Sequence, residues 1–342
     1  MHHSRTPAHL LSVLSVLAAT ASTIPTASAI GTFKDLQPGD FGYEAAVFLQ
    51  EKQIMTGYGD GTFKPDKAVN RAEAMKIVAF QFMTKVDEQP PTNPYKDVPD
   101  TAWFAPSIEW ARQKKIIRGP PDATTFFPTR TVTKAEFLKM MFLAYGVDPN
   151  AFGDISLPLS ADVKNSKEWH YPFFRYAIST SVQTVAPSGK FSPGKTLTRG
   201  EVAVLLHRFL LYRVGQRTQA LLDHTHEEIV KAQAALQTSD LTNAEYASAR
   251  ALLSARGAHA SMPDEVPVKV AVKTAEAIRA LVRAYRAGIL DRDLDAVIKH
   301  SQDAWFLAGQ AKAISPEAEV LAVQIQTYAT NFAASARKQK KR

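Results

Sequence analysis

The sequence predicts an all-α protein in which a helix–loop–helix unit occurs three times and a longer run of helices follows. Three observations lead to this fold class. The same residue types recur with a period of 62 to 65 positions between residues 30 and 213, and the second helix of each unit opens with a capping signal. Residues 214–342 lack the repeat and are rich in Ala, Gln and charged side chains at helical spacing.

The composition is that of a folded protein with an anionic partner. Of 342 residues, 45% are hydrophobic, which is enough for a core, and the length allows two or three domains. Lys and Arg number 41 against 33 Asp and Glu, and the formal net charge of +8 favours wall polymers, phospholipid head groups or nucleic acid. The absence of cysteine excludes disulfides, thiolate metal sites and a cysteine nucleophile.

Residues 1–29 have the pattern of a secretory signal peptide. Arg5 precedes the apolar run Leu10–Ala19, and small residues at Ala27-Ser28-Ala29 predict cleavage after Ala29. The apolar run is shorter than the roughly 20 residues that a membrane span needs. We therefore expect an exported, soluble mature chain with no transmembrane segment. A buried N-terminal helix is the alternative interpretation.

The repeat units are predicted over residues 30–90, 91–150 and 151–213. Each unit has an acidic residue near its start and a Phe-x-Pro sequence in its loop, ten positions before a glutamate of the second helix. The acidic residues are Asp35, Asp97 and Asp162, and the loop phenylalanines are Phe63, Phe126 and Phe191. Offsets that are fixed in this way indicate one fold for all three units.

The first helix of each unit is expected where apolar residues form one buried stripe. These helices are predicted over Tyr43–Lys52, Pro106–Lys115 and Pro172–Thr180. Gly57 and Gly119 follow the first two of them, and we expect each glycine to end its helix in the left-handed conformation.

The second helix of each unit opens with a capping box. The N-cap residues are Asn70, Thr133 and Thr198, and the glutamates at N3 are Glu73, Glu136 and Glu201. The apolar residues that precede the caps, and that we expect to form hydrophobic staples, are Val69, Val132 and Leu197. Helix initiation thus explains most of this motif.

One position of the motif is not explained by helix initiation. Arg71, Lys134 and Arg199 stand at N1, where the positive end of the helix dipole disfavours a cation by about 0.3–1 kcal/mol. Each base could pair with the acidic residue of a unit, or it could face an anionic ligand beside free N-terminal amides. The residues alone leave both interpretations open.

An aromatic residue near each first helix also has two interpretations. Phe41, Trp103 and Trp169 lie six or seven positions after the opening aspartate. A buried anchor is the commoner role for such residues. The other role is an exposed platform for a sugar ring, because these side chains have a flat apolar face.

At these residues the sequence resembles the S-layer homology (SLH) family. Unit one carries the family pattern nearly throughout, with Phe33-x-Asp35, Gly57-Tyr58-Gly-Asp-Gly-x-Phe63 and Asn70-Arg-Ala-Glu73. The resemblance covers about residues 32–212. It implies a three-pronged spindle, in which the units pack as a pseudo-trimer, and non-covalent anchoring to cell-wall polysaccharide at the bacterial surface.

The resemblance also implies where the glycan binds. Family members often hold a pyruvylated sugar in grooves between the prongs, with the basic residue of the motif facing its carboxylate. The implied glycan-binding residues are Arg71, Lys134, Arg199, Asp35, Asp97, Asp162, Trp103, Trp169, Gly57 and Tyr58. The sequence departs from the pattern in every unit. Unit two has Arg118-Gly-Pro-Pro-Asp122 in its loop and Lys134 in place of the motif arginine, unit three has Thr184-Val-Ala-Pro-Ser-Gly189 in its loop and Ser160 in place of the opening aromatic, and unit one lacks the tryptophan.

Residues 214–336 are predicted to form a helical hairpin or a small bundle. The candidate helices are 214–237, 242–256, 267–287, 291–313 and 316–336. The stretch 257–267 is expected to be a loop or linker, and residues 337–342 a disordered basic tail.

We identify no catalytic constellation in the sequence. His224 and His226 are two positions apart, so a helix points them in different directions, unlike a metal pair at i and i+4. No cofactor or metal is expected, and nucleic acid is not an expected partner of an exported chain. The leading hypothesis is a non-enzymatic anchor for anionic wall polysaccharide. The alternative is a wall-targeted enzyme with its chemistry in residues 214–342, and the sequence leaves the oligomeric state open.

Overall fold

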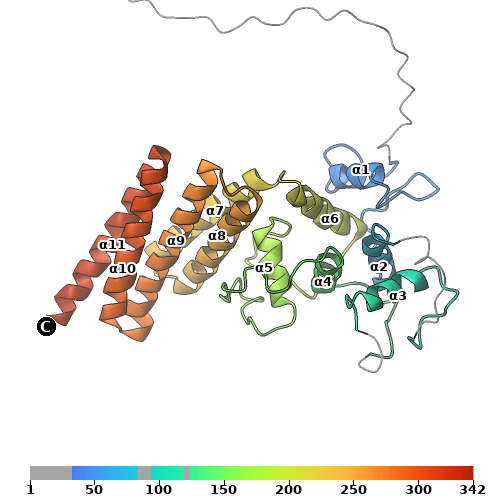
Figure 1. Ribbon diagram of the computed structural model, residues 1–342, viewed down its shortest axis with the longest axis horizontal. Coiled ribbons are helices and arrows are strands. Elements are labelled where there is room, and N and C mark those ends of the chain that lie inside the picture. The colour runs from blue at the N-terminus through green and yellow to red at the C-terminus, as the bar shows by residue number, and fades with distance from the viewer. Residues whose placement is uncertain (1–32, 84–93, 119–122, 342) are drawn as a thin grey trace, which may run out of the picture. The chain divides into compact units, whose positions relative to one another are not determined.

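The chain is helical throughout the part that the structure describes. The computed structural model describes residues 33–83, 94–118 and 123–341, and within these ranges it contains helices, turns and isolated β-bridges but no strand (Figure 1). The all-α prediction is thereby confirmed. The predicted signal peptide, residues 1–29, lies outside the described residues.

Each repeat unit supplies two helices, close to where the sequence predicts them. The first helices are α1 (Tyr43–Glu51), α3 (Ala105–Gln113) and α5 (Tyr171–Ser179), and the second helices are α2 (Arg71–Ala79), α4 (Lys134–Ala144) and α6 (Arg199–Arg213). All three second helices open with the expected capping box, in which the N-cap side chain accepts from the N3 amide and the N3 carboxylate accepts from the N-cap amide. Two donors at each helix start are satisfied in this way.

The residues that precede the three caps join the units in a closed ring of backbone hydrogen bonds. Val132 donates its N–H to the carbonyl of Val69 at 2.9 Å, Leu197 donates to Val132 at 3.1 Å, and Val69 donates to Leu197 at 2.9 Å. All three side chains are buried. Because the third unit bonds back to the first, no unit forms an end of the array, and the arrangement is the pseudo-trimer that the resemblance implied.

The first helices end at left-handed residues other than glycine. Gln53, Lys115 and Ser181 have φ of 56°, 58° and 56° at equivalent places in the three units. The prediction that Gly57 plays this part is wrong, and Gly119 lies outside the described residues. Gly57 is required for space instead, because a Cβ there would lie 2.9 Å from the carbonyl oxygen of Thr62.

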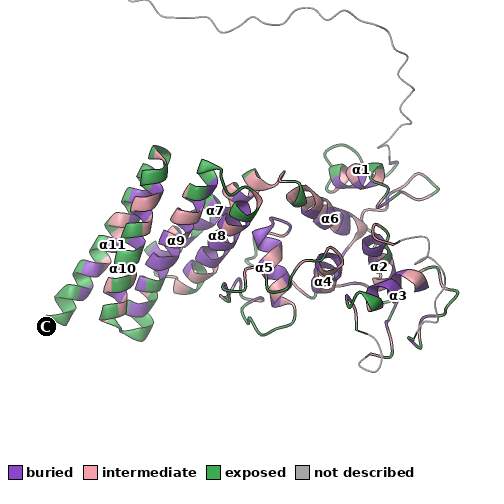
Figure 2. Ribbon diagram, viewed as in Figure 1, coloured by how far each residue is buried: buried purple, intermediate pink, exposed green. Residues whose placement is uncertain are grey.

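Five long helices follow the repeats. They are α7 (Thr218–Gln237), α8 (Leu241–Ser261), α9 (Val266–Arg286), α10 (Leu294–Ile314) and α11 (Glu319–Lys340), with a π-helical turn at Ala287–Asp291 and a 3-10 turn at Pro316–Ala318. Each packs against the next in sequence, and α9 also contacts α7 and α11. The buried stripes are rich in alanine (Figure 2), which lets neighbouring helices approach closely. None of the described helices is both long enough and apolar enough to cross a membrane.

Two expectations for this region are wrong. Helix α8 continues to Ser261, so residues 257–261 of the predicted linker 257–267 are helical. Helix α11 continues to Lys340, so the basic tail is helical over its described part. Lysine and arginine in a last turn interact favourably with the negative end of the helix dipole, which accounts for this extension.

The third repeat and the long helices are in direct contact at one glycine. Gly257 of α8 lies against the end of α5, where a Cβ would fall 1.5 Å from the carbonyl oxygen of Ser179. Close by, the buried Arg250 donates to Glu228 at 2.6 and 2.9 Å and to the carbonyl of Leu159 at 2.7 Å. The long helices are therefore packed on the repeats through backbone contact and the hydrogen bond from Arg250 to Leu159, while the buried ion pair joins α7 to α8.

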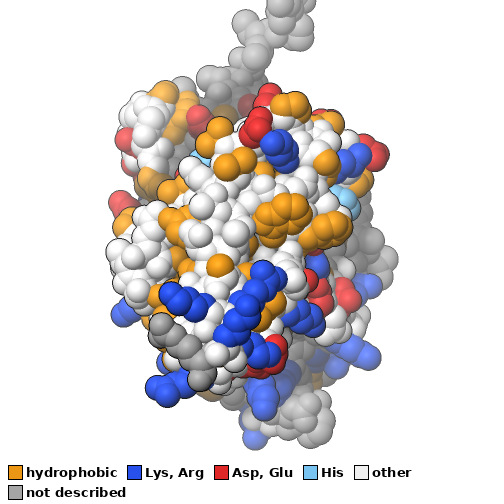
Figure 3. Space-filling view, turned by 90° about the vertical axis from the view of Figure 1, so that its left-hand side faces the viewer, with side chains coloured by type: hydrophobic (Ala, Val, Ile, Leu, Met, Phe, Trp, Pro, Cys, Tyr) orange, Lys and Arg blue, Asp and Glu red, His pale blue; other side chains and the backbone are white. Residues whose placement is uncertain are grey.

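The outer surface of α10 and α11 carries exposed apolar side chains. Trp305, Phe306 and Val320 are 51%, 59% and 71% exposed. Figure 3 shows hydrophobic side chains over much of this face and a gathering of Lys and Arg toward its lower end. The last turns of α11 carry Arg337, Lys338 and Lys340.

Candidate functional site

The N1 base of each second helix reaches the loop of the next unit. Arg71 Nε donates to the carbonyl of Phe126 at 2.9 Å, and Lys134 Nζ donates to that of Phe191 at 2.6 Å. Arg199 Nε donates to the carbonyl of Phe63 at 2.9 Å. The three contacts follow the same direction around the ring, so each base lies at a boundary between two units.

The backbone amides beside these bases are already bonded. The N–H groups of Arg71, Lys134 and Arg199 donate to loop carbonyls of the neighbouring unit at 2.8–2.9 Å, and the next amide along each helix does the same at 2.8–3.1 Å. The N3 amides donate to the caps. The expectation of free N-terminal amides for an anion is therefore wrong.

The opening aspartates hold the loops rather than the bases. Each carboxylate accepts from two successive backbone amides at 2.7–3.1 Å: Asp35 from Phe63 and Lys64, Asp97 from Phe126 and Phe127, and Asp162 from Phe191 and Ser192. The second residue of each pair, Lys64, Phe127 or Ser192, has φ between 56° and 60°. These aspartates thus fix a left-handed loop conformation that a non-glycine residue rarely adopts.

Burial of Asp162 acts against its charged form, but its hydrogen bonds outweigh burial. The Ser160 hydroxyl and the amides of Phe191 and Ser192 all stabilise the carboxylate, so the pKa of Asp162 lies below its ordinary value of 3.8. The interpretation that the three aspartates are the ion-pair partners of the bases is wrong, because their oxygens accept from the loop backbone. Their contact with a glycan stays a prediction.

Arg71 has a different internal partner. Its Nη1 lies 2.8 Å from Oε1 of Glu136, the N3 glutamate of unit two, which Arg130 also contacts. The Arg71 side chain is only 14% exposed, and burial lowers its pKa from the ordinary value while Glu136 opposes that change. The first boundary therefore contains a partly buried network of two arginines and one glutamate.

Lys134 and Arg199 have no carboxylate partner among the described residues. Lys134 is half-buried, and burial, followed by repulsion from Lys195, lowers its pKa. Arg199 donates from Nη2 to the carbonyl of Thr56 at 3.1 Å, and no ion pair accompanies this hydrogen bond. Carbonyl oxygens carry only partial charge, so both cations keep capacity for an anion.

At the boundary of units three and one, three cations surround one aromatic ring. The Tyr58 ring centroid lies 4.3 Å from Lys64 Nζ, 5.5 Å from Lys67 Nζ and 4.9 Å from Arg199 Cζ. Lys67 also donates to Glu73 at 2.7 Å and to the Tyr58 hydroxyl at 3.2 Å, and these hydrogen bonds raise its pKa. We refer to Tyr58, Lys64, Lys67 and Arg199 as the Tyr58 cluster.

The aromatic residues near the first helices are exposed, so the buried-anchor interpretation is wrong. Phe41, Trp103 and Trp169 are 63%, 56% and 55% exposed. Lys76 Nζ of unit one lies 4.9 Å from the Trp103 ring, and Lys139 Nζ of unit two lies 5.7 Å from the Trp169 ring. Each tryptophan thus presents a flat face beside a cation of the preceding unit.

Four lysines that the sequence motif does not single out also lie at these boundaries. Lys76 and Lys139 stand five positions after the N1 base in units one and two, where unit three has Val204. Lys67 and Lys195 stand six positions before the N3 glutamate, as Arg130 does in unit two. An alignment of the three units on their N3 glutamates would have revealed both repeated positions.

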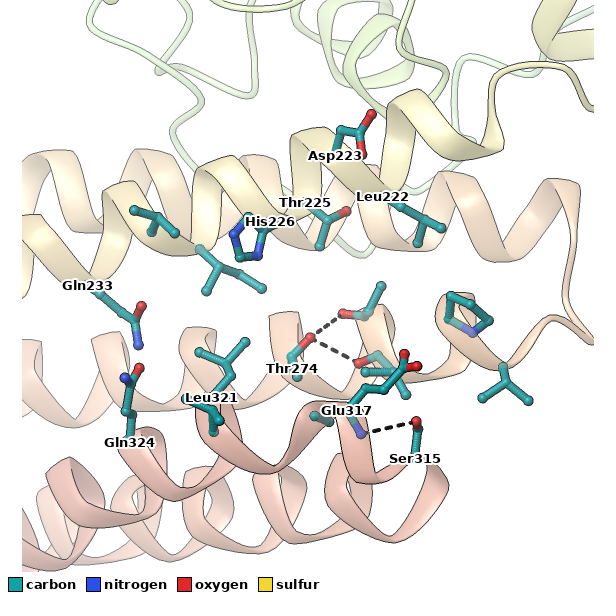
Figure 4. A pocket seen from close by; sticks show the side chains of 18 of the residues that line it. Leu222, Asp223, Thr225, His226, Gln233, Thr274, Ser315, Glu317, Leu321 and Gln324 are labelled. Carbon is teal, nitrogen blue, oxygen red and sulfur yellow. Dashed lines mark hydrogen bonds between the residues drawn. The ribbon is translucent and has the colours of Figure 1, made fainter. Parts of the chain in front are cut away.

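The long helices contain a separate pocket of about 570 Å³ between α7, α9 and the start of α11 (Figure 4). Leu222, Thr225 and His226 lie on its α7 wall, and Leu321 and Gln324 face them from α11. His224 instead contacts Glu227 of its own helix at 3.8 Å. The two histidines do not converge, and the described residues contain no group of three or more His, Asp and Glu that could hold a metal ion.

Comparison with known families agrees with these features. The model of the S-layer homology domain matches residues 32–75 and 94–138. Those segments hold the loop aspartate, the capping box and the N1 base of units one and two. These two segments are S-layer homology domains.

Individual relatives match mainly over part of the chain. Cell surface glycoprotein 1 of Acetivibrio thermocellus is 30% identical over 182 residues, which are 51% of this chain and 7% of that protein. The cellulosome-anchoring protein of the same organism is 33% identical over 113 residues, 32% of this chain and 25% of its own length. An endoglucanase of Bacillus sp. is 29% identical over 119 residues, 35% of this chain and 12% of the enzyme.

The chain therefore spans a quarter or less of these relatives. Relatives of this kind and the family itself belong to the bacterial surface. This protein is accordingly a secreted protein of the cell surface or cell wall.

Proposed function

We propose that the repeats anchor this protein non-covalently to the cell wall by binding an anionic polysaccharide, such as a pyruvylated one. Residues 151–213 act as the third repeat of the set, because they carry the same capping box, loop aspartate and N1 base. The observation that carries the proposal is Arg199, which has no carboxylate partner among the described residues and lies 4.9 Å from the centroids of both the Tyr58 and the Phe63 ring. Two lysines approach the same Tyr58 ring. A carboxylate on a sugar supplies the missing anion, and Tyr58 supplies a surface for the sugar ring.

The three boundaries contribute unequally in this proposal. Arg199 of the Tyr58 cluster and Lys134 form no ion pair among the described residues, whereas Lys64, Lys67 and Arg71 are paired with Asp60, Glu73 and Glu136. At the first two boundaries, Trp103 with Lys76 and Trp169 with Lys139 offer exposed platforms for a charged sugar. Gly57 and the three aspartates act by fixing the loops that carry these groups.

The test is binding of the intact mature chain to purified wall polysaccharide. Arg199→Ala removes the guanidinium and should weaken binding by about 1.5–3 kcal/mol, the range for hydrogen bonds to charged groups. Tyr58→Ala should also weaken binding, because the sugar loses its stacking surface. Lys114→Ala is the matched control, since Lys114 is an exposed repeat lysine away from these contacts, and its affinity should equal that of the wild type.

The ligand's charge is tested in the same titration. Chemical removal of the acidic substituents from the polysaccharide should abolish the difference between the wild type and Arg199→Ala. If the neutral polymer binds as tightly as the native one, the anion-binding proposal is wrong. Circular dichroism of each variant separates lost binding from lost structure.

We further propose that the chain is not itself an enzyme. The sequence has no motif of a hydrolase or a metal enzyme, and the relatives include surface and anchoring proteins. The alternative is a wall-targeted enzyme, because one relative is an endoglucanase. Release of sugar or peptide from wall polymer that a single Asp or Glu substitution after residue 214 abolishes would favour that alternative.

A further inference from the structure

A second pocket lies where the third repeat meets the long helices. It has a volume of about 580 Å³ and is bounded by residues 154–157 and by helices α8, α9 and α10. Its apolar wall consists of Ile155, Leu157, Leu252, Ala280, Phe306 and Leu307. Phe306 is 59% exposed, so the apolar wall extends to the open side of the pocket. We call this space the Arg279 pocket, after the residue discussed next.

Arg279 of α9 is a buried cation without an anion. It is only 7% exposed, and Nη1 donates to the hydroxyl of Ser248 at 3.1 Å. Nε is fully buried and has no hydrogen-bond partner among the described residues, where Nη2 makes no hydrogen bond and no carboxylate forms an ion pair with the side chain. Burial, and then repulsion from Arg283, lowers its pKa to about 10. A buried guanidinium that lacks a hydrogen-bond acceptor and a counter-ion destabilises the folded chain unless a ligand supplies them.

The lining of the pocket holds three carboxylates and three arginines. Asp154 is paired with Arg256, Glu276 with Lys273 at 3.1 Å, and Asp303 lies 3.7 Å from His300. Arg283, which is exposed at the pocket, has no ion pair among the described residues. Arg279 and Arg283 are therefore the arginines of this lining that form no ion pair among the described residues.

The atom of Arg279 that a ligand in the pocket can reach is Nη2. Nε is closed to a group the size of a water molecule, whereas Nη2 is not fully buried and its N–H groups suit a carboxylate oxygen as acceptor. The nearby carboxylates disfavour a dianion such as phosphate. The apolar wall favours a ligand whose anionic head is attached to a hydrocarbon body.

We propose that the Arg279 pocket binds an organic monocarboxylate, with its oxygens on Arg279 and its apolar body against Leu252 and Phe306. This site lies outside the glycan-binding boundaries and is independent of the anchoring function. It assigns the long helices a binding role of their own.

The experiment titrates the intact mature chain with acetate, hexanoate and benzoate, and follows heat of binding and thermal melting. Hexanoate and benzoate should bind more tightly than acetate, because they bury apolar surface. Arg279→Gln should weaken all three by about tenfold or more. Arg279→Lys keeps the charge but lacks the planar guanidinium and its Nη2 donors, and should weaken them as well. Phe306→Ala should weaken hexanoate and leave acetate unchanged.

Controls separate a binding site from a structural arginine. Without ligand, Arg279→Gln should melt at the same temperature as the wild type or higher, because an unpaired buried charge is removed. Lys338→Gln removes an exposed charge of α11 and should bind as the wild type does. Absence of saturable binding to the wild type, unchanged affinity in both Arg279 variants, or tighter binding of inorganic phosphate than of any carboxylate would overturn the proposal. Wall binding should be unaffected by Arg279→Gln, so either proposal can fail alone.

Discussion

Arg199 donates from Nε to the carbonyl oxygen of Phe63 at 2.9 Å, across 136 positions of the sequence. This hydrogen bond joins the last repeat to the first and places the guanidinium 4.9 Å from the centroids of both Tyr58 and Phe63. The same side chain thus closes the ring of units and presents a cation at the boundary. Arg199 therefore contributes both to the stability of the ring and to the proposed binding. For this reason, a binding experiment on a variant of an N1 base also needs a separate measurement of its stability.

Arg71→Ala is expected to destabilise the repeats. The substitution leaves the carbonyl of Phe126 and one oxygen of Glu136 without their partner, which should lower the free energy of unfolding by about 1–3 kcal/mol. The helix dipole alone would predict a small gain instead. Urea unfolding of the variant and of the control Lys114→Ala distinguishes the two, and equal stability of both variants would contradict the ion-pair network.

Asp162 makes the stability of the third unit depend on pH. Its pKa is lowered in the folded chain, so its stabilising effect is complete above the ordinary value of 3.8 and is lost as the pH falls through the folded-state pKa. Asp162→Asn should therefore be less stable than the wild type at neutral pH, and the two should converge in acid. Thermal melts from pH 7 down to about pH 2 measure this. A difference that stays constant with pH would assign the effect to packing.

Gly257→Ala is expected to disturb the contact between α8 and α5. A methyl group would overlap the carbonyl oxygen of Ser179, so the helices must move apart, at a cost of about 1–3 kcal/mol or more. Gly309→Ala is the matched control in a long helix, because the nearest atom there is the end of the flexible Gln326 side chain at 3.3 Å. Thermal unfolding should show a clear loss for the first variant and a small change for the second.

The Arg250–Glu228 pair should show strong coupling in a double-mutant cycle. Both side chains are nearly buried, at 10% and 8% exposed, so loss of one partner leaves a charge in the interior and should cost about 3–5 kcal/mol. Replacement of both, as Arg250→Met with Glu228→Leu, should cost clearly less than the sum of the single changes. Additive losses in urea unfolding would mean that the two charges act independently.

The sequence was sufficient for the elements whose signals are local. The capping boxes at Asn70, Thr133 and Thr198 depend on residues three positions apart, and they occur as predicted. The repeat period likewise predicted which residues share a role. The roles of Asp35, Asp97 and Asp162 were not predictable, because each aspartate accepts from amides 28 to 30 positions away.

A local sequence pattern also cannot predict the partners of the N1 bases. Arg71 meets a glutamate of the following unit, 65 positions away, and only the closed ring brings them together. The exposure of Trp103 has the same origin, since burial is decided by which unit packs beside it. Helix α8 continues past residue 256, where the predicted helix ends, and Gly257 lies inside it in close contact with α5, which the sequence alone does not reveal.

The contact of Gly257 with Ser179 has a mechanical consequence. A protein tethered to a surface by a flexible linker can turn freely about its attachment point. Here helix meets helix with no intervening spacer, and a pull on the long helices is passed directly into α5 and the ring of repeats. If the repeats bind the wall as proposed, the exposed face of α10 and α11 would accordingly keep a fixed orientation relative to the wall.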